Sequence, residues 1–374
     1  HYLYPKIGLE FPMPEDGYRG SYIPQLAENV YERLGSQLAS VQGQQRLGLV
    51  EEEGKKLVLE SIRNALKDMG VSYDTWFSER SLVEQGWNDQ VLQEFRARGV
   101  VYDNEGAVWL RSTEFGDDKD RVLVRRDGEP TYTLTDAAYH YNKYRRGYTK
   151  SIDIFGADHI GHIVPMQALM KSLGLPDDFL EIIIYQIVHF LRNGQRVVLS
   201  KQTGEMIELA DLVREVGVDQ ARVFFLLSSA DSELEFDLEV AKTNSLDNPA
   251  YYLKYTHARL CSVERQAGTV GLLLPDHVEP VDVELLSTGE DRELLKCLLK
   301  AQDEVDDAAC ARQPHRVLYL ASELAKSVNT FYQKEKVIQD DMPLGRARMV
   351  LVLASRRLLG AYAHILGITL PESM

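Results

Sequence analysis

The sequence predicts an α/β fold built on a doubly wound parallel sheet, followed by an all-α helical bundle. Between residues 151 and 191, a short apolar strand, a glycine turn, a helix and a β-branched strand follow one another, which is typical of such a sheet. From about residue 246 onwards, the apolar residues recur at a spacing of three or four, which indicates helices. We therefore expect two domains, 1–245 and 246–374, with an inserted α/β segment at roughly 48–130.

The elements of the first domain follow from apolar spacing and from turn residues. Helical spacing, mostly ended by glycine, predicts helices at 24–35, 50–70, 136–147, 162–174, 208–217 and 218–229. Runs of β-branched residues between turn residues predict strands within 108–136, at 151–158 and at 179–191. Ligands of doubly wound sheets bind at the carboxyl ends of strands, and FGADH, at 155–159, lies at such an end.

Four segments of the second domain carry the helical period. These predicted helices lie at 248–266, 291–310, 314–338 and 345–367. The stretch 267–290 is rich in glycine, proline and acidic residues, so we expect an extended surface loop there.

Composition and charge exclude few classes of protein. The 374 residues are 44% hydrophobic and 26% charged, which is ordinary for a globular protein, and we find no apolar run of ~20 residues that would span a membrane. The net charge of −15 argues against nucleic-acid binding by the chain as a whole. Basic stretches at 143–150 and 346–357 could nevertheless contact phosphates, or be solvated helix faces.

Two further features bear on the setting of the protein. Cys261, Cys297 and Cys310 show no CxxC spacing, so we expect neither a disulfide framework nor a zinc site, and a reducing cytoplasmic location. The chain begins HYLYPKIGLEF, with neither an initiator methionine nor a leader peptide, so we expect a fragment of a longer protein.

A candidate phosphate-binding loop, VVLSKQTGEM, lies at 197–206 after a predicted turn at Arg192 to Gly194. Its Ser200, Lys201 and Gly204 could place an ammonium group on a triphosphate, where it stabilises the charge that develops in a transition state. The alternative is a solvated loop lysine.

A candidate cation site lies in PTYTLTDAAYH, at 130–140. Tyr132 and Asp136 are four residues apart at a predicted junction between strand and helix, so both can face one pocket. A carboxylate there suits a guanidinium group, which it can bind through two hydrogen bonds. The alternative is that Asp136 caps the helix that follows.

The stretch GADHIGH at 156–162 places Asp158, His159 and His162 at the end of a predicted central strand. We favour a ligand pocket for these side chains. A local turn and a metal site are the alternatives, and the metal site is the weaker one because zinc sites usually draw a further ligand from a known motif.

Taken together and in order, these stretches resemble the arginyl-tRNA synthetase family of the bacterial type. The matching stretches are FPMPEDGYRGSYI (11–23), DTWFSERSL (74–82), 111–140, FGADHIGH (155–162), 199–226, 231–241, NPAYYLKYTHAR (248–259) and LGITLPESM (366–374). The resemblance implies a partial Rossmann-like catalytic domain of class I and an α-helical anticodon-binding domain.

The letters H-I-G-H at 159–162 match a known class I signature, but they stand in the wrong place. In the family that signature follows the first strand of the nucleotide-binding fold, far before the Ser-Lys loop. Here only one predicted strand separates the two. We therefore interpret the letters as a coincidence and expect the true signature, and an N-terminal tRNA-binding domain, to be absent from this chain.

The resemblance also implies roles for individual residues. Ser200 and Lys201 match the second half of the family's K-M-S-K loop and are the expected catalytic residues, with Val198 and Leu199 where the loop often has Lys and Met. Arginine is expected to bind at Tyr132, Asp136 and Asp158, and ATP at Gly156, His159, Val198, Leu199 and Lys201. In the second domain, Tyr255, Tyr332, Lys336 and Met374 are expected to contact tRNA.

The function that the resemblance implies is an arginine–tRNA ligase. It would activate arginine with ATP, accompanied by Mg2+, and transfer it to tRNA(Arg); we expect no protein-bound metal and a cytoplasmic monomer without membrane partners. We expect this chain alone not to charge tRNA. The alternatives are a non-catalytic tRNA-binding or regulatory paralogue, and a class I synthetase for cysteine, glutamine or glutamate.

Overall fold

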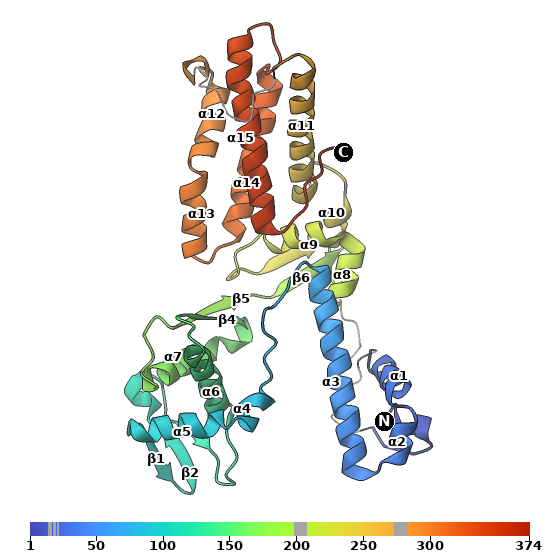
Figure 1. Cartoon of the computed structure of the whole chain (residues 1–374), viewed down its shortest axis with the longest axis vertical. Coiled ribbons are helices and arrows are strands. Elements are labelled where there is room, and N and C mark those ends of the chain that lie inside the picture. Colours follow the sequence, from blue (N-terminus) through green and yellow to red (C-terminus); the bar gives the residue numbers. More distant parts are fainter. Residues whose placement is uncertain (14–16, 18–19, 21, 198–207, 273–282) are drawn as a thin grey trace. The chain divides into compact units, whose positions relative to one another are not determined.

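The computed structural model describes residues 1–13, 17, 20, 22–197, 208–272 and 283–374, and its chain is shown in Figure 1. These residues form two compact units, which are described separately. Unit 1 comprises His1–Ser72, His189–Ser229 and Glu235–Met374, and unit 2 comprises Tyr73–Val188 and Ala230–Leu234.

Unit 2 combines a small antiparallel sheet with a parallel pair of strands. The antiparallel sheet has the order β1-β2-β3, and its first hairpin turns at Glu105 and Gly106, which both have positive φ. Helix α6 packs against α5 and against β3. The bounds of the elements up to α6 are α4 Arg80–Glu84, α5 Trp87–Ala97, β1 Val101–Asn104, β2 Ala107–Leu110, η2 Ser112–Phe115, β3 Arg121–Val124 and α6 Tyr132–Arg145.

The parallel pair of unit 2 confirms the predicted strand–helix–strand unit. Strand β4 (Ser151–Gly156) pairs in parallel with β5 (Leu180–Tyr185), and the chain between them forms η3 (Ala157–His162) and α7 (Ile163–Ser172). One hydrophobic core joins the antiparallel sheet and β5 to α5, α6 and α7. Its fully buried large side chains include Phe95, Leu110, Leu123, Leu134, Leu169 and Phe179.

The prediction of one strand over 179–191 is wrong. The chain forms β5 and then β6 (Val188–Arg192), which belong to different sheets, and the break falls at Gln186 and Ile187. The N–H of Gln186 donates instead to the carbonyl of Ala230, 2.8 Å away. A continuous apolar run does not reveal such a break, because both strands are rich in β-branched residues.

The N-terminal part of unit 1 is a small helical cluster. It contains η1 (Tyr4–Ile7), α1 (Tyr22–Leu34), α2 (Ser36–Ser40) and α3 (Gly43–Asp68). Helix α1 packs on α3 over a core that includes the buried Leu3, Val30 and Leu38.

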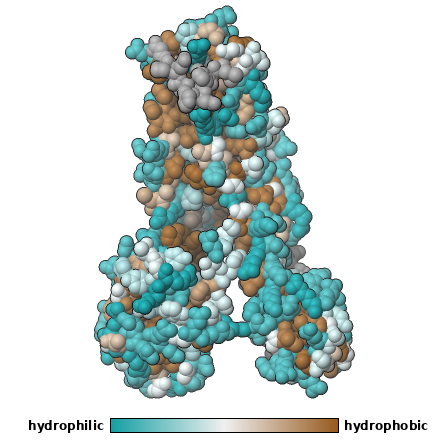
Figure 2. All heavy atoms as spheres, viewed as in Figure 1, coloured by the Kyte–Doolittle hydropathy of each residue, from teal (hydrophilic) through white to brown (hydrophobic). Residues whose placement is uncertain are grey.

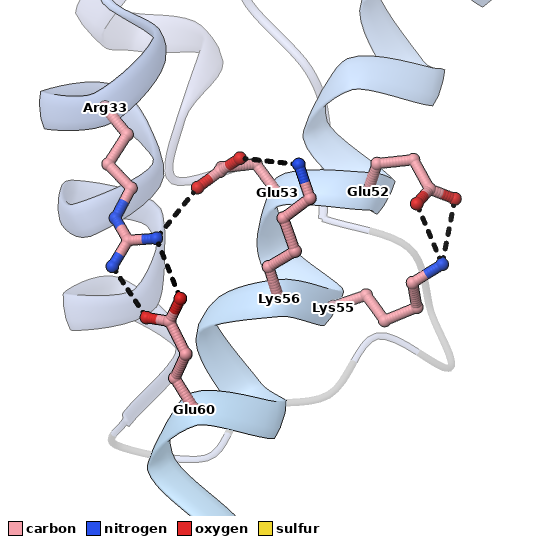
Figure 3. Close-up of polar contacts among 6 residues, drawn as sticks. All are labelled: Arg33, Glu52, Glu53, Lys55, Lys56 and Glu60. Carbon is pink, nitrogen blue, oxygen red and sulfur yellow. Dashed lines mark hydrogen bonds and ion pairs between the residues drawn. The ribbon is translucent and has the colours of Figure 1, made fainter. Parts of the chain in front are cut away.

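Ion pairs line the contact between α1 and α3. Arg33 of α1 donates to Glu53 at 3.0 Å and to Glu60 at 2.7 Å, both on α3 (Figure 3). The hydrogen bonds from Arg33 are the main reason why the pKa of Glu60 lies below its usual value. Lys55 and Lys56 each pair with a glutamate one turn earlier on α3, so these two lysines neutralise charge on their own helix.

The middle of unit 1 holds a small sheet with the order β7-β6-β8 and three short helices. The turn predicted at Arg192 to Gly194 is confirmed, because Asn193 and Gly194 both have positive φ between β6 and β7. The bounds are β7 Gln195–Arg196, α8 Leu209–Val216, α9 Val218–Phe225, β8 Leu234–Asp237 and α10 Leu238–Lys242.

Helix α9 connects distant parts of unit 1. The guanidinium of Arg222 donates to the carbonyl of Met69 at 2.7 Å, just beyond the end of α3, and to that of Leu366 at 2.8 Å, the last residue of α15. These carbonyls are unsatisfied ends of helices, so one side chain stabilises two C-termini.

The C-terminal part of unit 1 is the predicted helical bundle. Its elements are α11 Pro249–Thr269, η4 Val283–Leu285, α12 Gly289–Leu299, α13 Ala301–Cys310, α14 His315–Lys334 and α15 Met342–Leu366 (Figure 1). Asn248 caps α11, and Thr288 forms a capping box with Asp291 at the start of α12. The single helix predicted over 291–310 is broken at Lys300 into α12 and α13.

Helix α15 qualifies the expectation that no segment could span a membrane. Among the helices of the described residues, only α15 has the length and the apolar composition to cross a membrane. Of its most apolar window, 44% is buried inside the structure. The sequence reading missed it because Arg356 and Arg357 interrupt the apolar run. Since α15 packs against α11, α12 and α14, its apolar character fits a core helix of the bundle. Figure 2 shows apolar and polar side chains interspersed over the visible face of the bundle.

Candidate functional site

A pocket of about 540 Å³ opens in unit 2 where α4, α6, η3 and α7 converge. It lies next to the carboxyl end of β4, where ligands of doubly wound sheets bind. Its lining combines aromatic rings with two carboxylates and two histidines: Phe77, Glu79, Leu82, Tyr132, Thr135, Asp136, Tyr139, Phe155, His159, His162 and Met166.

Tyr132 and Asp136 lie one turn apart on helix α6, and both line this pocket. The helix begins at Tyr132, after Thr131, and not at Asp136. The alternative in which Asp136 caps the helix is therefore wrong, because this residue lies inside the second turn. The two side chains meet the pocket through the i, i+4 spacing of a helix.

The Asp136 carboxyl is held in a state that favours a cationic ligand. Desolvation is the largest effect and raises its pKa. The negative charges of Glu79 and Asp153 raise the pKa further, whereas His140 and His162 lower it. Among the described residues, the structure gives the Asp136 carboxylate no hydrogen-bond partner. A bound cation would relieve this desolvation, since an opposite charge favours the ionised form.

Glu79 is a second pocket carboxylate that the sequence reasoning did not single out. It stands immediately before α4, some distance along the chain from α6, and contributes to the negative potential at Asp136. The stretch DTWFSERSL contains it, but nothing in its spacing relates it to Asp136. Phe77 and Tyr139 were also missed; their ring centroids are 4.9 Å apart, and both rings line the pocket.

The structure brings only part of the GADHIGH stretch into the pocket. His159 and His162 line it, with ring centroids 5.2 Å apart, whereas Asp158 is not among the lining residues and its side chain is 82% exposed. A Cβ on Gly156 would lie 2.6 Å from Asp158 Oδ1, so any larger residue there requires Asp158 to move. No cluster of three potential metal ligands occurs within the described ranges.

A buried polar cluster lies behind the pocket. His140 Nε2 is 2.7 Å from Asp153 Oδ2, and Lys143 Nζ is 3.1 Å from Asp153 Oδ1. Burial alone would raise the pKa of Asp153, but the hydrogen bond and charge of His140, together with Lys143, lower it to about 2. The Asp153 carboxylate is therefore ionised at neutral pH.

The predicted phosphate-binding loop lies outside the described residues. This applies to Val198, Leu199, Ser200 and Lys201. The hairpin of β6 and β7 leads directly to this segment, as the sequence predicts.

In the bundle, Arg259 of α11 lies between two of the predicted tRNA contacts. Its guanidinium carbon is 4.6 Å from the ring centroid of Tyr255 and 4.8 Å from that of Tyr332, which is on α14. Asn329 accepts a hydrogen bond from the same guanidinium at 2.6 Å. Tyr332 is 44% exposed, so part of this side chain remains accessible beside the Arg259 guanidinium.

The other two predicted tRNA contacts lie on loops that the bundle holds by their backbones. The carbonyl of Lys336 accepts a hydrogen bond from the buried Arg348, and the Lys336 residue is exposed. The C-terminal segment is held through Pro371, whose carbonyl lies 2.9 Å from His257 Nδ1, while Met374 is 60% exposed. Both side chains are therefore accessible on anchored segments.

Two family models match the chain. Residues 32–237, more than half of the chain, match the family described as tRNA synthetases class I (R), catalytic domain. Residues 253–374 match the DALR anticodon binding domain.

Curated relatives and solved structures agree with these matches. The chain is 41% identical over 369 residues to the arginine–tRNA ligase of Bacillus subtilis (strain 168) and 40% identical over 368 residues to that of Desulfitobacterium hafniense (strain DSM 10664 / DCB-2). Each match covers 98% of the chain and 66% of the relative, so the chain spans about two thirds of the length of these relatives.

A solved structure from Campylobacter jejuni, assigned to arginyl-tRNA synthetase, has a TM-score of 0.85 and 30% identity, covering 98% of this chain and 78% of that one. Arginyl-tRNA synthetase from Thermus thermophilus has a TM-score of 0.74 at 20% identity, covers 100% of this chain and 73% of that one, and shows the fold alone. The predicted fold class, a class I catalytic domain followed by a helical anticodon-binding domain, is confirmed.

Proposed function

We propose that the chain, which belongs to the class I arginyl-tRNA synthetase family, carries the arginine site and the anticodon-binding part of an arginine–tRNA ligase. The observation that carries this proposal is the pocket with Asp136 and Glu79, two carboxylates among aromatic rings. The division of the chain into a catalytic domain at 1–245 and an anticodon-binding domain at 246–374 forms part of the proposal.

Arginine would bind with its guanidinium group toward Asp136. A guanidinium is planar and presents N–H groups in a fixed fork, so a carboxylate can accept two of them at once. Glu79 supplies a second negative charge, and the rings of Phe77, Tyr132 and Tyr139 suit the flat faces of the cation. A neutral side chain of similar shape would leave the two carboxylates uncompensated, which supports selection by charge.

ATP would bind toward Gly156 and His159, at the carboxyl end of β4, with Asp158 close to the arginine. Ser200 and Lys201 would stabilise the charge on the pyrophosphate leaving group, with Val198 and Leu199 beside the nucleotide. The carboxylate of arginine attacks the α-phosphate of ATP, and pyrophosphate leaves. Such a reaction depends on positioning and electrostatics and needs no protein nucleophile. Mg2+ as a companion of ATP stays a prediction, and no step is assigned to a protein-bound metal.

The helical bundle would read the anticodon loop of tRNA(Arg). Tyr332 offers an accessible ring beside the Arg259 guanidinium, an arrangement on which an unpaired base can stack. Tyr255 supports Arg259 from the other side, and Lys336 and Met374 are exposed residues on anchored segments. A cytoplasmic monomer without membrane partners is our expectation for the whole protein, and analytical ultracentrifugation tests the oligomeric state.

The decisive experiment measures ligand selectivity. We expect isothermal titration calorimetry to detect arginine binding to the chain, and Asp136→Asn to abolish it. In the whole protein, pyrophosphate exchange should depend on arginine and on tRNA(Arg). Exchange driven by cysteine, glutamine or glutamate would refute the assignment, and binding of tRNA without any exchange would favour a non-catalytic paralogue. The expectation that the 374-residue chain does not charge tRNA is tested by aminoacylation with the purified chain.

A further inference from the structure

The buried polar cluster behind the pocket has no part in the proposed chemistry. His140 is 3% exposed and Asp153 9% exposed, so both residues are buried. Placing charged groups in the interior is unfavourable unless they are paired and hydrogen bonded. In this cluster the charged groups are paired and hydrogen bonded in that way.

Both ring nitrogens of His140 face acceptors. Nδ1 lies 2.8 Å from the main-chain carbonyl of Asp136, and Nε2 lies 2.7 Å from the ionised carboxylate of Asp153. The imidazole therefore lies between a main-chain carbonyl of α6 and a carboxylate of β4.

The cluster joins the two walls of the pocket. On the α6 side, His140 holds the carbonyl of Asp136, one of the lining residues. On the β4 side, Asp153 precedes the lining residue Phe155 by two positions. Both contacts are made by the one ring of His140.

Lys143 reinforces the same connection. Its ammonium group lies 3.0 Å from Ser151 Oγ and 3.1 Å from Asp153 Oδ1, both on β4. It also lies 4.3 Å from the centroid of the Tyr139 ring, which lines the pocket. A second α6 side chain is thus fixed to β4 beneath the pocket wall.

We propose that His140 is a positioning residue of the pocket: its imidazole ring, held by Asp153, fixes the second turn of α6 against β4 and so sets where the Asp136 carboxylate stands. This inference rests on the proposed function, because it assumes that Asp136 receives a guanidinium group. It assigns to His140 no contact with substrate. Its effect on binding passes through Asp136.

The test compares arginine with citrulline, a neutral ligand of nearly the same shape. Calorimetry gives the affinity of the chain for each, in the wild type, in His140→Gln and in Asp153→Asn, with His364→Gln on the exposed surface of α15 as the matched control. We expect both variants to lose arginine affinity by about tenfold to a hundredfold while citrulline binding changes less than about twofold. A merely structural role would weaken both ligands alike and leave their ratio unchanged.

Each outcome separates this inference from the proposed function. A wild-type chain that does not prefer arginine over citrulline refutes the proposed function. A wild-type preference that survives in a folded His140→Gln variant overturns the inference. Should neither variant fold, ¹⁵N NMR of the wild-type imidazole decides: a hydrogen bond between His140 Nε2 and the Asp153 carboxylate is expected, and a ring nitrogen without that bond overturns the inference.

Discussion

Acidification should lower the free energy of unfolding of unit 2 because it protonates Asp153. The size of the loss follows from the lowered pKa of this carboxyl. The pKa of this carboxyl falls from an unperturbed 3.8 to about 2 because His140 and Lys143 outweigh its burial. A group with a lowered pKa contributes stability above its unfolded pKa and loses it as the pH falls through the folded value. The shift corresponds to about 2.5 kcal/mol, present at pH 5 and lost by about pH 2.

The assay is urea unfolding followed by tryptophan fluorescence. The protein contains three tryptophans, Trp76, Trp87 and Trp109, and all of them lie in unit 2, so the signal reports on that unit. At pH 5 the free energy of unfolding of Asp153→Asn should be lower than that of the wild type by about 2.5 kcal/mol. This difference should shrink by about 1 kcal/mol at pH 3. Asp178→Asn, an exposed carboxylate, is the control. A gap that stays constant between pH 5 and pH 3 would refute the reasoning.

Three further predictions concern other parts of the chain. Asp136→Asn should raise the melting temperature of the ligand-free protein at neutral pH in differential scanning fluorimetry, because the folded pKa of Asp136 is raised and its ionised form opposes folding; a lowered melting temperature would contradict this. Tyr332→Ala should weaken tRNA(Arg) binding in a filter assay by about 1–3 kcal/mol, the value of one stacked base, whereas the exposed Tyr319→Ala should not. Arg348→Met should lower the free energy of unfolding by about 3–5 kcal/mol, because it leaves the buried Asp291 without its cation. Urea unfolding followed by circular dichroism measures this loss. The exposed Arg346→Met serves as control, and equal losses in both variants would contradict the prediction.

The sequence predicts elements well where one physical signal decides them. The helical period identifies α11, α14 and α15 because each buries one long face over several turns. Boundaries fail where a contact distant in sequence decides. The start of α6 at Tyr132 and the break at Gln186 both depend on partners in other segments, such as the Ala230 carbonyl.

The candidate site is predictable only in part, for the same reason. Tyr132 and Asp136 share a helix, so their spacing alone relates them. Glu79 reaches the same pocket from another element, and no local pattern indicates it. His140 and Asp153 are separated by a helix end and a turn, so their hydrogen bond exists only once α6 has packed on β4.

The Arg222 contacts also bear on the order in which the protein forms during synthesis. Unit 2 is nearly one continuous stretch of chain, Tyr73–Val188, so almost all of it has left the ribosome long before the bundle is made. The bond from Arg222 to Leu366 spans 144 positions and has to wait until Leu366 has been made. A nascent chain stalled before α15 should therefore contain a folded unit 2, complete with its pocket. In that chain Arg222 can bond the carbonyl of Met69 after α3, but its second partner, the carbonyl of Leu366, does not yet exist.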